Sequence, residues 1–220
     1  MHNNLAVQFQ AIRGLSPEAN QRQCKQDIRQ VKKGGYLEIK GNTYLVSEAF
    51  RYLEVKWSSF KKKKNEYWVT ELQLLNVLTG EKTFIEWEFD DELEVSQTVS
   101  EVQLKDLTEN GKPLTRNMLD DIAEEESGII KYKGKNFHYI EDDTWAALFY
   151  RNAADEPLQV RMYEFKSDDG TCLTLELWEE EDSKPEREAF ISRELVASAI
   201  KVLQPELIVI GNREGADEAI

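Results

Sequence analysis

The chain has 220 residues, of which 40% are hydrophobic and 10% aromatic, and its formal net charge is −14. This composition excludes an intrinsically disordered protein, and no apolar run approaches the roughly 18 residues that a membrane-spanning helix needs. The N-terminus lacks the basic start and apolar core of a secretory signal, so we expect a cytoplasmic protein.

The acidic charge is unevenly distributed along the chain. Residues 1–110 hold 15 basic and 17 acidic side chains, whereas residues 111–220 hold 13 basic and 25 acidic ones. Like-charge repulsion argues against nucleic acid as a partner of the second half, and against an anionic membrane. An acidic second half fits a basic protein partner, although net charge also serves solubility.

The N-terminal segment, residues 1–33, is expected to contain one helix over residues 17–33. Ser16 suits the N-cap and Pro17 the first helical position. At the other end, Lys32 and Lys33 followed by a glycine are typical of the last turn of a helix. The apolar stripe of this helix is thin, so we expect it to dock weakly.

Residues 34–107 are expected to form a first β-unit, because the apolar residues change to a period of two. A hairpin is predicted around Gly41, and turn residues separate the strands that follow. The later predicted strands are residues 52–57, 67–74, 83–89 and 93–95. Short strands with frequent turns favour a meander, a barrel or a sandwich.

Residues 108–127 are expected to be a linker with a short helix that opens at Pro113. Residues 128–203 then form a second β-unit, with a hairpin around Gly134. Its other predicted strands are residues 145–150, 160–165 and 172–178. The stretch 195–203 is compatible with a short helix or a strand, and residues 204–220 are expected to form a tail.

A recurring pattern links the two β-units. Gly35 and Gly41, six residues apart, match Gly128 and Gly134 at an offset of 93. The turn before Glu86 matches the turn before Glu176 at an offset of 90. The pattern predicts an internally duplicated, mainly β protein with barrel-like or sandwich-like units. We expect residues 34–203 to form one pseudo-symmetric body, with a ligand or partner groove between its units.

Glu86 and Glu176 are the candidate ligand-binding residues, because the repeat places them at equivalent positions. Two carboxylates brought together could share a proton or bind a cation. The simpler interpretation is that each points to solvent, since each alternates with apolar neighbours on its strand. A deep apolar pocket that contains both would favour ligand binding or an enzyme, whereas a flat interface with both carboxylates in water would favour a protein–protein role.

One basic and aromatic segment is the candidate contact for an anionic partner. Four consecutive lysines are flanked by tryptophans that could stack on bases or lie at a lipid headgroup interface. The candidate residues are Lys61, Lys62, Lys63, Lys64, Trp57 and Trp68. A solvated hairpin tip explains the same residues, so a membrane surface is a weak expectation and nucleic acid is not expected.

Catalytic signatures are absent from the sequence. It has no nucleophile-elbow serine motif, phosphate-binding lysine loop, dinucleotide fingerprint or paired-histidine zinc motif. Cys24 and Cys172 are far apart, and no Cys/His cluster has zinc spacing. We therefore expect no catalytic residue, no metal and no cofactor.

The order of these residues resembles the bacterial family called domain of unknown function 4178. The resemblance is carried by the two glycine pairs and by segments spread over residues 34–203; among these segments are Trp68-x-x-Glu71-Leu72, Phe84-Ile85-Glu86, Tyr163-Glu164-Phe165 and Leu173-x-Leu175-Glu176. It implies a β-rich, duplicated domain, and a genomic association with membrane-stress and polyamine-synthesis genes. Family members often carry a Cys-x-x-Cys segment before the domain, whereas Cys24 stands alone in this chain.

Together these observations predict a non-enzymatic interaction or scaffold protein of a bacterial stress-response system, with a protein partner. The alternative is a small-molecule or polyamine-binding module that uses the glutamates between the two β-units. A third alternative is an enzyme built on the same two glutamates and on aromatic walls. The sequence does not define the partner or the oligomeric state.

Overall fold

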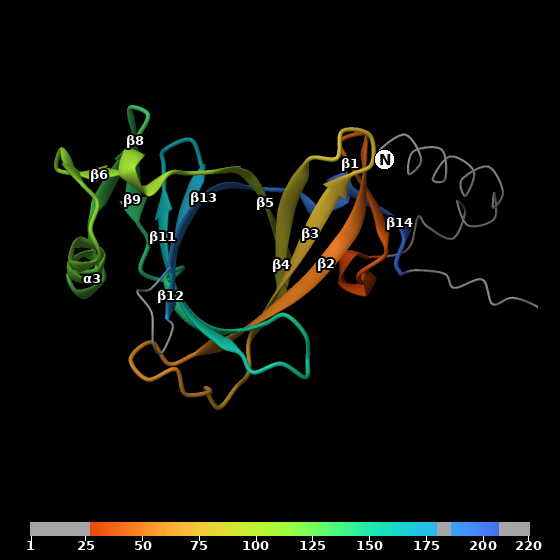
Figure 1. Cartoon of the computed structure of the whole chain (residues 1–220), viewed down its shortest axis with the longest axis horizontal. Helices are drawn as coiled ribbons and strands as arrows, with labels where there is room; N and C mark the ends of the chain where they lie inside the picture. The colour runs from red at the N-terminus through yellow and green to blue at the C-terminus, as the bar shows by residue number, and fades with distance from the viewer. Residues whose placement is uncertain (1–26, 180–185, 207–220) are drawn as a thin grey trace, which may run out of the picture.

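The computed structural model describes residues 27–179 and 186–206, and its centre is a closed β-barrel (Figure 1). Eight strands form the barrel wall. They are β2 (Asn42–Val55), β3 (Trp68–Asn76), β4 (Lys82–Phe89), β5 (Leu93–Glu101), β10 (Trp145–Tyr150), β11 (Leu158–Lys166), β12 (Cys172–Glu179) and β13 (Glu186–Glu194). The prediction of a mainly β fold is confirmed.

The barrel closes because β10 pairs with both β11 and β2. The order around the wall is β2-β3-β4-β5-β13-β12-β11-β10, and each neighbouring pair is antiparallel. Strands of both predicted β-units therefore share one wall. An eight-stranded barrel is wide enough to be filled by side chains or to hold one small ligand.

Additional elements flank the barrel on two sides (Figure 1). On one side lie β1 (Tyr36–Ile39) and β14 (Ile200–Gln204), next to the short 3-10 turn η2 (Ile28–Gln30). The 3-10 turn η4 (Ala197–Ala199) precedes β14 on this same side. The other side carries four short strands and a helix, with η3 (Leu104–Asp106) leading into them. These are β6 (Thr108–Glu109), β7 (Lys112–Pro113), α3 (Arg116–Glu124), β8 (Ile129–Tyr132) and β9 (Lys135–Tyr139).

Two of the apolar cores lie outside the barrel wall. The outer face of β11–β13 packs against α3, β8 and β9 through residues such as Leu119, Ile130 and Phe137. The outer face of β3 and β4 packs against β1, β14 and η2, where Leu37 and Val202 are buried. Burial of these faces by the flanking elements supplies much of the hydrophobic stabilisation of the fold.

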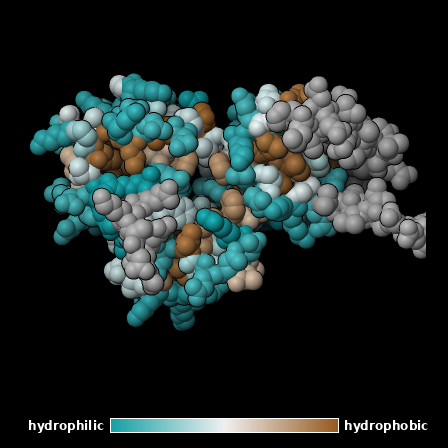
Figure 2. All heavy atoms as spheres, in the orientation of Figure 1, coloured by the Kyte–Doolittle hydropathy of each residue, from teal (hydrophilic) through white to brown (hydrophobic). Residues whose placement is uncertain are grey.

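The barrel interior is only partly apolar. One part is filled by a smaller cluster of buried side chains: Tyr52, Val69, Ala147, Phe149, Val160 and Met162. The outside of the molecule is mostly hydrophilic in the view of Figure 2, with apolar atoms in a few separate patches. The rest of the interior is polar, and this polar part forms the candidate site.

The predicted hairpins around Gly41 and Gly134 are present. Lys40 and Gly41 have φ angles of 49° and 82°, and Lys133 and Gly134 have 47° and 81°. Two successive positive φ angles are typical of a type I′ turn, which matches the twist of the strands it connects. The β1–β2 and β8–β9 hairpins thus have the same type of turn, while the internal duplication itself stays a prediction.

The predicted helix over residues 17–33 is wrong in the part that the structure describes, and its residues 17–26 lie outside the described residues. Only Ile28–Gln30 is helical, as a 3-10 turn, and the Asp27 side chain accepts a hydrogen bond from the Arg29 amide. Val31 is extended, and both it and Ile28 are buried against the barrel. Packing of these two residues replaces the helix that local propensity favoured.

Three other boundaries differ from the prediction. The strand predicted to restart at residue 52 is the end of one 14-residue strand, β2, which carries a bulge between Val46 and Glu48. The linker helix begins at Arg116, capped by Thr115, because Pro113 belongs to β7. In the stretch 195–203, residues 197–199 form a 3-10 turn and the strand β14 begins at residue 200, so each alternative holds for part of it.

Candidate functional site

A cavity of about 480 Å³ lies inside the barrel. All eight barrel strands contribute to its lining, and on β2, β3, β4 and β13 the lining residues alternate, as the period of a β-strand requires. Glu71 and Gln73 of β3 line the cavity, for example, whereas Leu72 and Leu74 point to the outer core.

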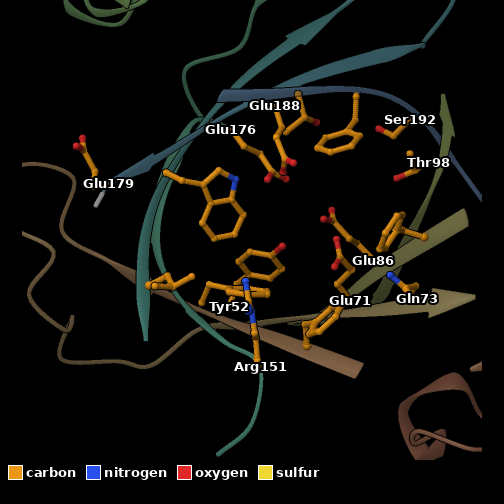
Figure 3. Close-up of a pocket in the computed structure, with 17 residues that line it drawn as sticks. Tyr52, Glu71, Gln73, Glu86, Thr98, Arg151, Glu176, Glu179, Glu188 and Ser192 are labelled. Atoms are coloured by element: carbon orange, nitrogen blue, oxygen red, sulfur yellow. The ribbon is translucent and has the colours of Figure 1, made fainter. Parts of the chain in front are cut away.

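Two pairs of glutamates meet in this cavity from opposite walls. Glu71 on β3 lies directly across from Glu86 on β4, and Glu176 on β12 lies directly across from Glu188 on β13. Figure 3 shows both pairs with their carboxylates directed toward the centre of the cavity. Opposed like charges on neighbouring strands destabilise a sheet, so this arrangement is costly for the empty protein.

Burial and mutual repulsion raise the pKa values of these carboxyl groups. Glu176 is only 6% exposed, and desolvation, followed by the charges of Glu86 and Glu188, raises its pKa to about 8. Desolvation likewise raises the pKa of Glu86 to about 7, with a smaller contribution from Glu88. Both groups therefore titrate near neutral pH, where ordinary glutamates are fully ionised.

Glu71 lines the cavity as well, and Glu164 interacts electrostatically with Glu86 and Glu176. Desolvation raises the pKa of Glu71 well above its usual range, Glu86 adds to that effect, and a hydrogen bond from Tyr52 opposes it. Glu164 accepts a hydrogen bond of 2.9 Å from the Thr174 hydroxyl, but its pKa is also raised by burial. The hydroxyl groups of Tyr52 and Thr174 thus donate hydrogen bonds to these carboxylates, but they supply no positive charge to balance them.

No lysine or arginine among the described residues forms an ion pair with Glu71, Glu86, Glu164 or Glu176. The indole N–H of Trp178 lowers the pKa of Glu176, the smallest of the effects on that group. That N–H nevertheless makes no hydrogen bond of normal geometry within the described part of the chain. Buried charges are ordinarily paired, so the charge in the cavity is left for protons or for a bound cation to balance.

An aromatic wall lies beside the carboxylates. Phe149 contacts three other rings that line the cavity, with ring centroids 5.4 Å away for Phe50, 4.9 Å for Tyr52 and 5.1 Å for Trp178. Aromatic faces attract cations, and they also cover the hydrocarbon part of an amine. The cavity therefore offers both kinds of surface that an organic cation needs.

A second hollow of about 860 Å³ adjoins the cavity at one end of the barrel. The two share Phe84, Thr98 and Phe190 in their linings. This wider hollow carries charges of both signs, including Lys82 and Glu101.

The geometry does not suit a metal ion. Within residues 27–179 and 186–206 no three His, Cys, Asp or Glu side chains are grouped closely enough to hold one. The glutamate pairs instead face one another across an open volume, which suits a ligand larger than an ion. No helix in the described ranges is long and apolar enough to cross a membrane.

A comparison with protein families shows which family the chain belongs to. The model of a family described as "Domain of unknown function (DUF4178)" matches residues 32–195. The chain belongs to the DUF4178 family. The matched part of this DUF4178 domain contains all eight barrel strands, and therefore the whole cavity. Neither curated proteins nor solved structures gave a match.

The two glutamates singled out in the sequence, Glu86 and Glu176, lie in the same cavity of the DUF4178 domain. The interpretation that they point to solvent is wrong. Their apolar neighbours, such as Ile85 and Leu175, face outward because flanking elements cover the outer wall. The glutamates are consequently left on the inner face. The predicted groove between two units is replaced by a cavity within one barrel.

The lysine segment lies apart from the cavity, and part of it is already paired. Lys62 forms an ion pair of 3.7 Å with Glu66, and Lys63 pairs with Glu54. All four lysines, 61–64, are exposed.

The two tryptophans that flank the lysine segment contact other residues of the protein. Trp57 packs edge-on against Tyr163, with ring centroids 5.3 Å apart. Trp68 lies under the Arg51 guanidinium, whose central carbon is 3.9 Å from the ring centroid. Both tryptophans are thus engaged within the molecule.

Sequence reasoning missed three carboxylates and one arginine of the cavity. The missed residues are Glu71, Glu179, Glu188 and Arg151. Glu164, which interacts electrostatically with Glu86 and Glu176, was missed as well. Glu71 and Glu164 lie in segments that carried the family resemblance, and both alternate with apolar residues as Glu86 does. A search for every glutamate at such positions would have found them. Arg151 follows a strand and carried no such signal.

Proposed function

We propose that this DUF4178 domain is a small-molecule-binding protein whose barrel takes an organic cation of the amine class. The observation that carries the proposal is Glu176, which is 6% exposed, directed into the cavity and without an ion-pair partner among the described residues. Glu86 and Glu176 line one pocket rather than a flat interface, which supports a bound ligand, and the lining is partly polar where an apolar pocket was expected.

The energetics support this choice. A carboxylate held in a partly desolvated cavity lowers the stability of the fold, and a glutamine of the same shape would avoid that cost. An ammonium group placed between the pairs would form charge-assisted hydrogen bonds with several carboxylates at once. The arrangement is thus unfavourable when empty and favourable when a cation is bound.

The volume and the lining of the cavity also fit an organic amine. A volume of about 480 Å³ lies within the range of small-ligand sites, roughly 300–1,000 Å³. The rings of Phe50, Tyr52, Phe149 and Trp178 provide an apolar and cation-attracting surface next to the carboxylates. A linear amine, such as a polyamine, satisfies both parts of the lining.

Thermal shift and calorimetry with a graded series of amines test the proposal. The series is n-pentylamine, 1,4-diaminobutane and spermidine, with 1,4-butanediol as the uncharged control. Saturable stabilisation by an amine, lost in Glu176→Gln and kept in Glu92→Gln at an exposed turn, is the expected result. No stabilisation by any amine at millimolar concentration would refute it.

The internal duplication is part of the proposal, since it would give each half of the barrel one of the glutamates 86 and 176. The alike hairpin turns at Gly41 and Gly134 support it. Aligning the two halves over many family members is the test. Similarity between residues 34–107 and 128–203 is expected, and none above chance would contradict the idea.

The interaction or scaffold role in a bacterial stress response stays a prediction, as does the enzyme alternative. A pull-down from native cells tests the former, with a reproducible basic protein partner as the expected result. For the lysine segment, changing residues 61–64 to glutamate should weaken binding to anionic vesicles if that surface is used. Equal or absent binding in both proteins would leave it a solvated loop.

A further inference from the structure

Arg151 is the cavity residue that the proposed binding of a cation does not explain. It follows the last residue of β10, is exposed, and lines the same cavity as the glutamates. Figure 3 shows its side chain reaching from the edge of the cavity toward Tyr52. A guanidinium at this position repels an ammonium ligand unless the ligand also carries a group that the guanidinium binds.

The other arginines near this end of the barrel are already engaged. Arg51 stacks on Trp68, and Arg161 pairs with Glu179 while its guanidinium carbon lies 4.7 Å from the Phe60 ring centroid. Arg151 has no ion-pair partner among the described residues. Glu179 borders the cavity too, but its carboxylate points away from it in Figure 3. The charge of Arg151 is therefore available to a ligand.

The strand register gives the separation of the two kinds of charge. Tyr150 pairs with Arg51, so the next position, Arg151, falls opposite Phe50, and Phe50 pairs with Glu71. Arg151 and Glu71 are thus two strand spacings apart, or about 10 Å between their α-carbons. Both side chains extend into the cavity and shorten this gap. The ring of Phe50 lies between them on the wall.

We propose that the ligand is a small zwitterion, an aliphatic compound with an ammonium group at one end and a carboxylate or similar planar anion at the other. This inference rests on the proposed function. The ammonium lies among Glu71, Glu86 and Glu176, the hydrocarbon chain lies against Phe50 and Phe149, and Arg151 binds the anion through paired N–H donors. A chain of about four to six carbons fits the separation.

Calorimetry with matched probes on the full-length protein tests the inference. The probes are 5-aminopentanoate, n-pentylamine, 1,5-diaminopentane and pentanoate. The wild type should bind 5-aminopentanoate at least about 10-fold more tightly than n-pentylamine, a difference of about 1.4 kcal/mol. Arg151→Gln should remove that difference, because 5-aminopentanoate loses its partner and n-pentylamine, no longer repelled by the guanidinium, binds at least as tightly as before. Arg151→Lys should restore part of the difference.

Arg51→Gln is the matched control, because Arg51 lies at the same end of the barrel and faces outward, so it should leave every affinity unchanged. Equal binding of the amine and the zwitterion by the wild type would overturn the inference but leave the proposed function standing. An Arg151→Gln variant with unchanged preference would do the same. If none of the four probes binds, both the inference and the proposed function are overturned.

Discussion

Glu176 on β12 and Glu188 on β13 lie directly opposite each other in the antiparallel ladder, and both point into the barrel. Glu71 and Glu86 repeat this relationship on β3 and β4. A sheet gains stability from unlike or apolar cross-strand pairs and loses it from like charges. The barrel therefore keeps its acidic interior at the expense of stability, which is common where a binding site is maintained.

Replacing the Glu176 carboxylate by an amide should stabilise the empty protein. Glu176→Gln removes a desolvated charge that faces other carboxylates, so we expect the free energy of unfolding at pH 8 to rise by about 1 kcal/mol. Urea denaturation measures it, with Glu92→Gln as the exposed control. A clear loss of stability would mean that the carboxylate is a structural element.

The stability of the empty protein should fall as the pH rises from about 5 to 8. The carboxyl groups of Glu176 and Glu86 have folded-state pKa values of about 8 and about 7, above the ordinary 4.5. Between these values the folded state holds protons that the unfolded state has released, so each group contributes a slope of at most about 1.4 kcal/mol per pH unit. The groups that face them are Glu71, Glu164, Glu188, Tyr52 and Arg151.

Unfolding free energies from denaturant titrations at several pH values check this slope. In Glu176→Gln the slope should be smaller, since one of the titrating groups is gone. A saturating amine should flatten it further. A stability that is constant or rises over this pH range would show that the interior carboxylates ionise as they do in water.

Removing the Glu179 side chain should loosen the attachment of α3 to the barrel. Glu179 accepts a 3.1 Å hydrogen bond from Arg116 at the start of α3, and it also pairs with Arg161 on β11. Glu179→Ala leaves two arginines without their shared partner, which should cost about 1–2 kcal/mol. Thermal unfolding measures it, and Arg116→Ala alone should cost less. Equal melting temperatures for all three proteins would contradict the role.

The two glycines that open the repeated pattern should differ in their tolerance of alanine. A β-carbon at Gly35 would lie 2.7 Å from the Pro205 carbonyl oxygen, which is backbone and cannot move alone. At Gly128 it would lie 2.6 Å from the Ile122 side chain, which has some freedom to shift. We expect Gly35→Ala to cost about 2–3 kcal/mol and Gly128→Ala about 1 kcal/mol. Melting temperatures in the reverse order would contradict this.

Much of the strand content could be read from the sequence, because the period of two and the turn glycines are local signals. The hairpins at Gly41 and Gly134 and the strand at 145–150 are examples. Local signals failed at residues 28–33, where burial of Ile28 and Val31 against the barrel overrides helix propensity. They failed again in β2, where a bulge lets one strand continue through an apparent break.

The position of the candidate site could not be predicted from the sequence for a different reason. Alternation in Ile85-Glu86-Trp87 establishes that Glu86 and Ile85 face opposite sides, but not which side is inside the barrel. That depends on α3, β8 and β9 on one flank and on β1, β14 and η2 on the other, which cover the outer wall. Since those contacts join residues far apart in the sequence, a local pattern could identify these glutamates as candidates but could not place them inside the barrel.

The most direct test of an amine site inside the barrel is the proton balance of binding. Calorimetric titration of 5-aminopentanoate and of n-pentylamine at pH 7, in two buffers of different ionisation enthalpy, gives the number of protons released. The wild type should release about one proton per bound amine, because the ammonium favours the ionised forms of Glu86 and Glu176. The double variant Glu86→Gln with Glu176→Gln should show neither saturable binding nor proton release. Binding without proton release, or no binding by the wild type, would contradict the account.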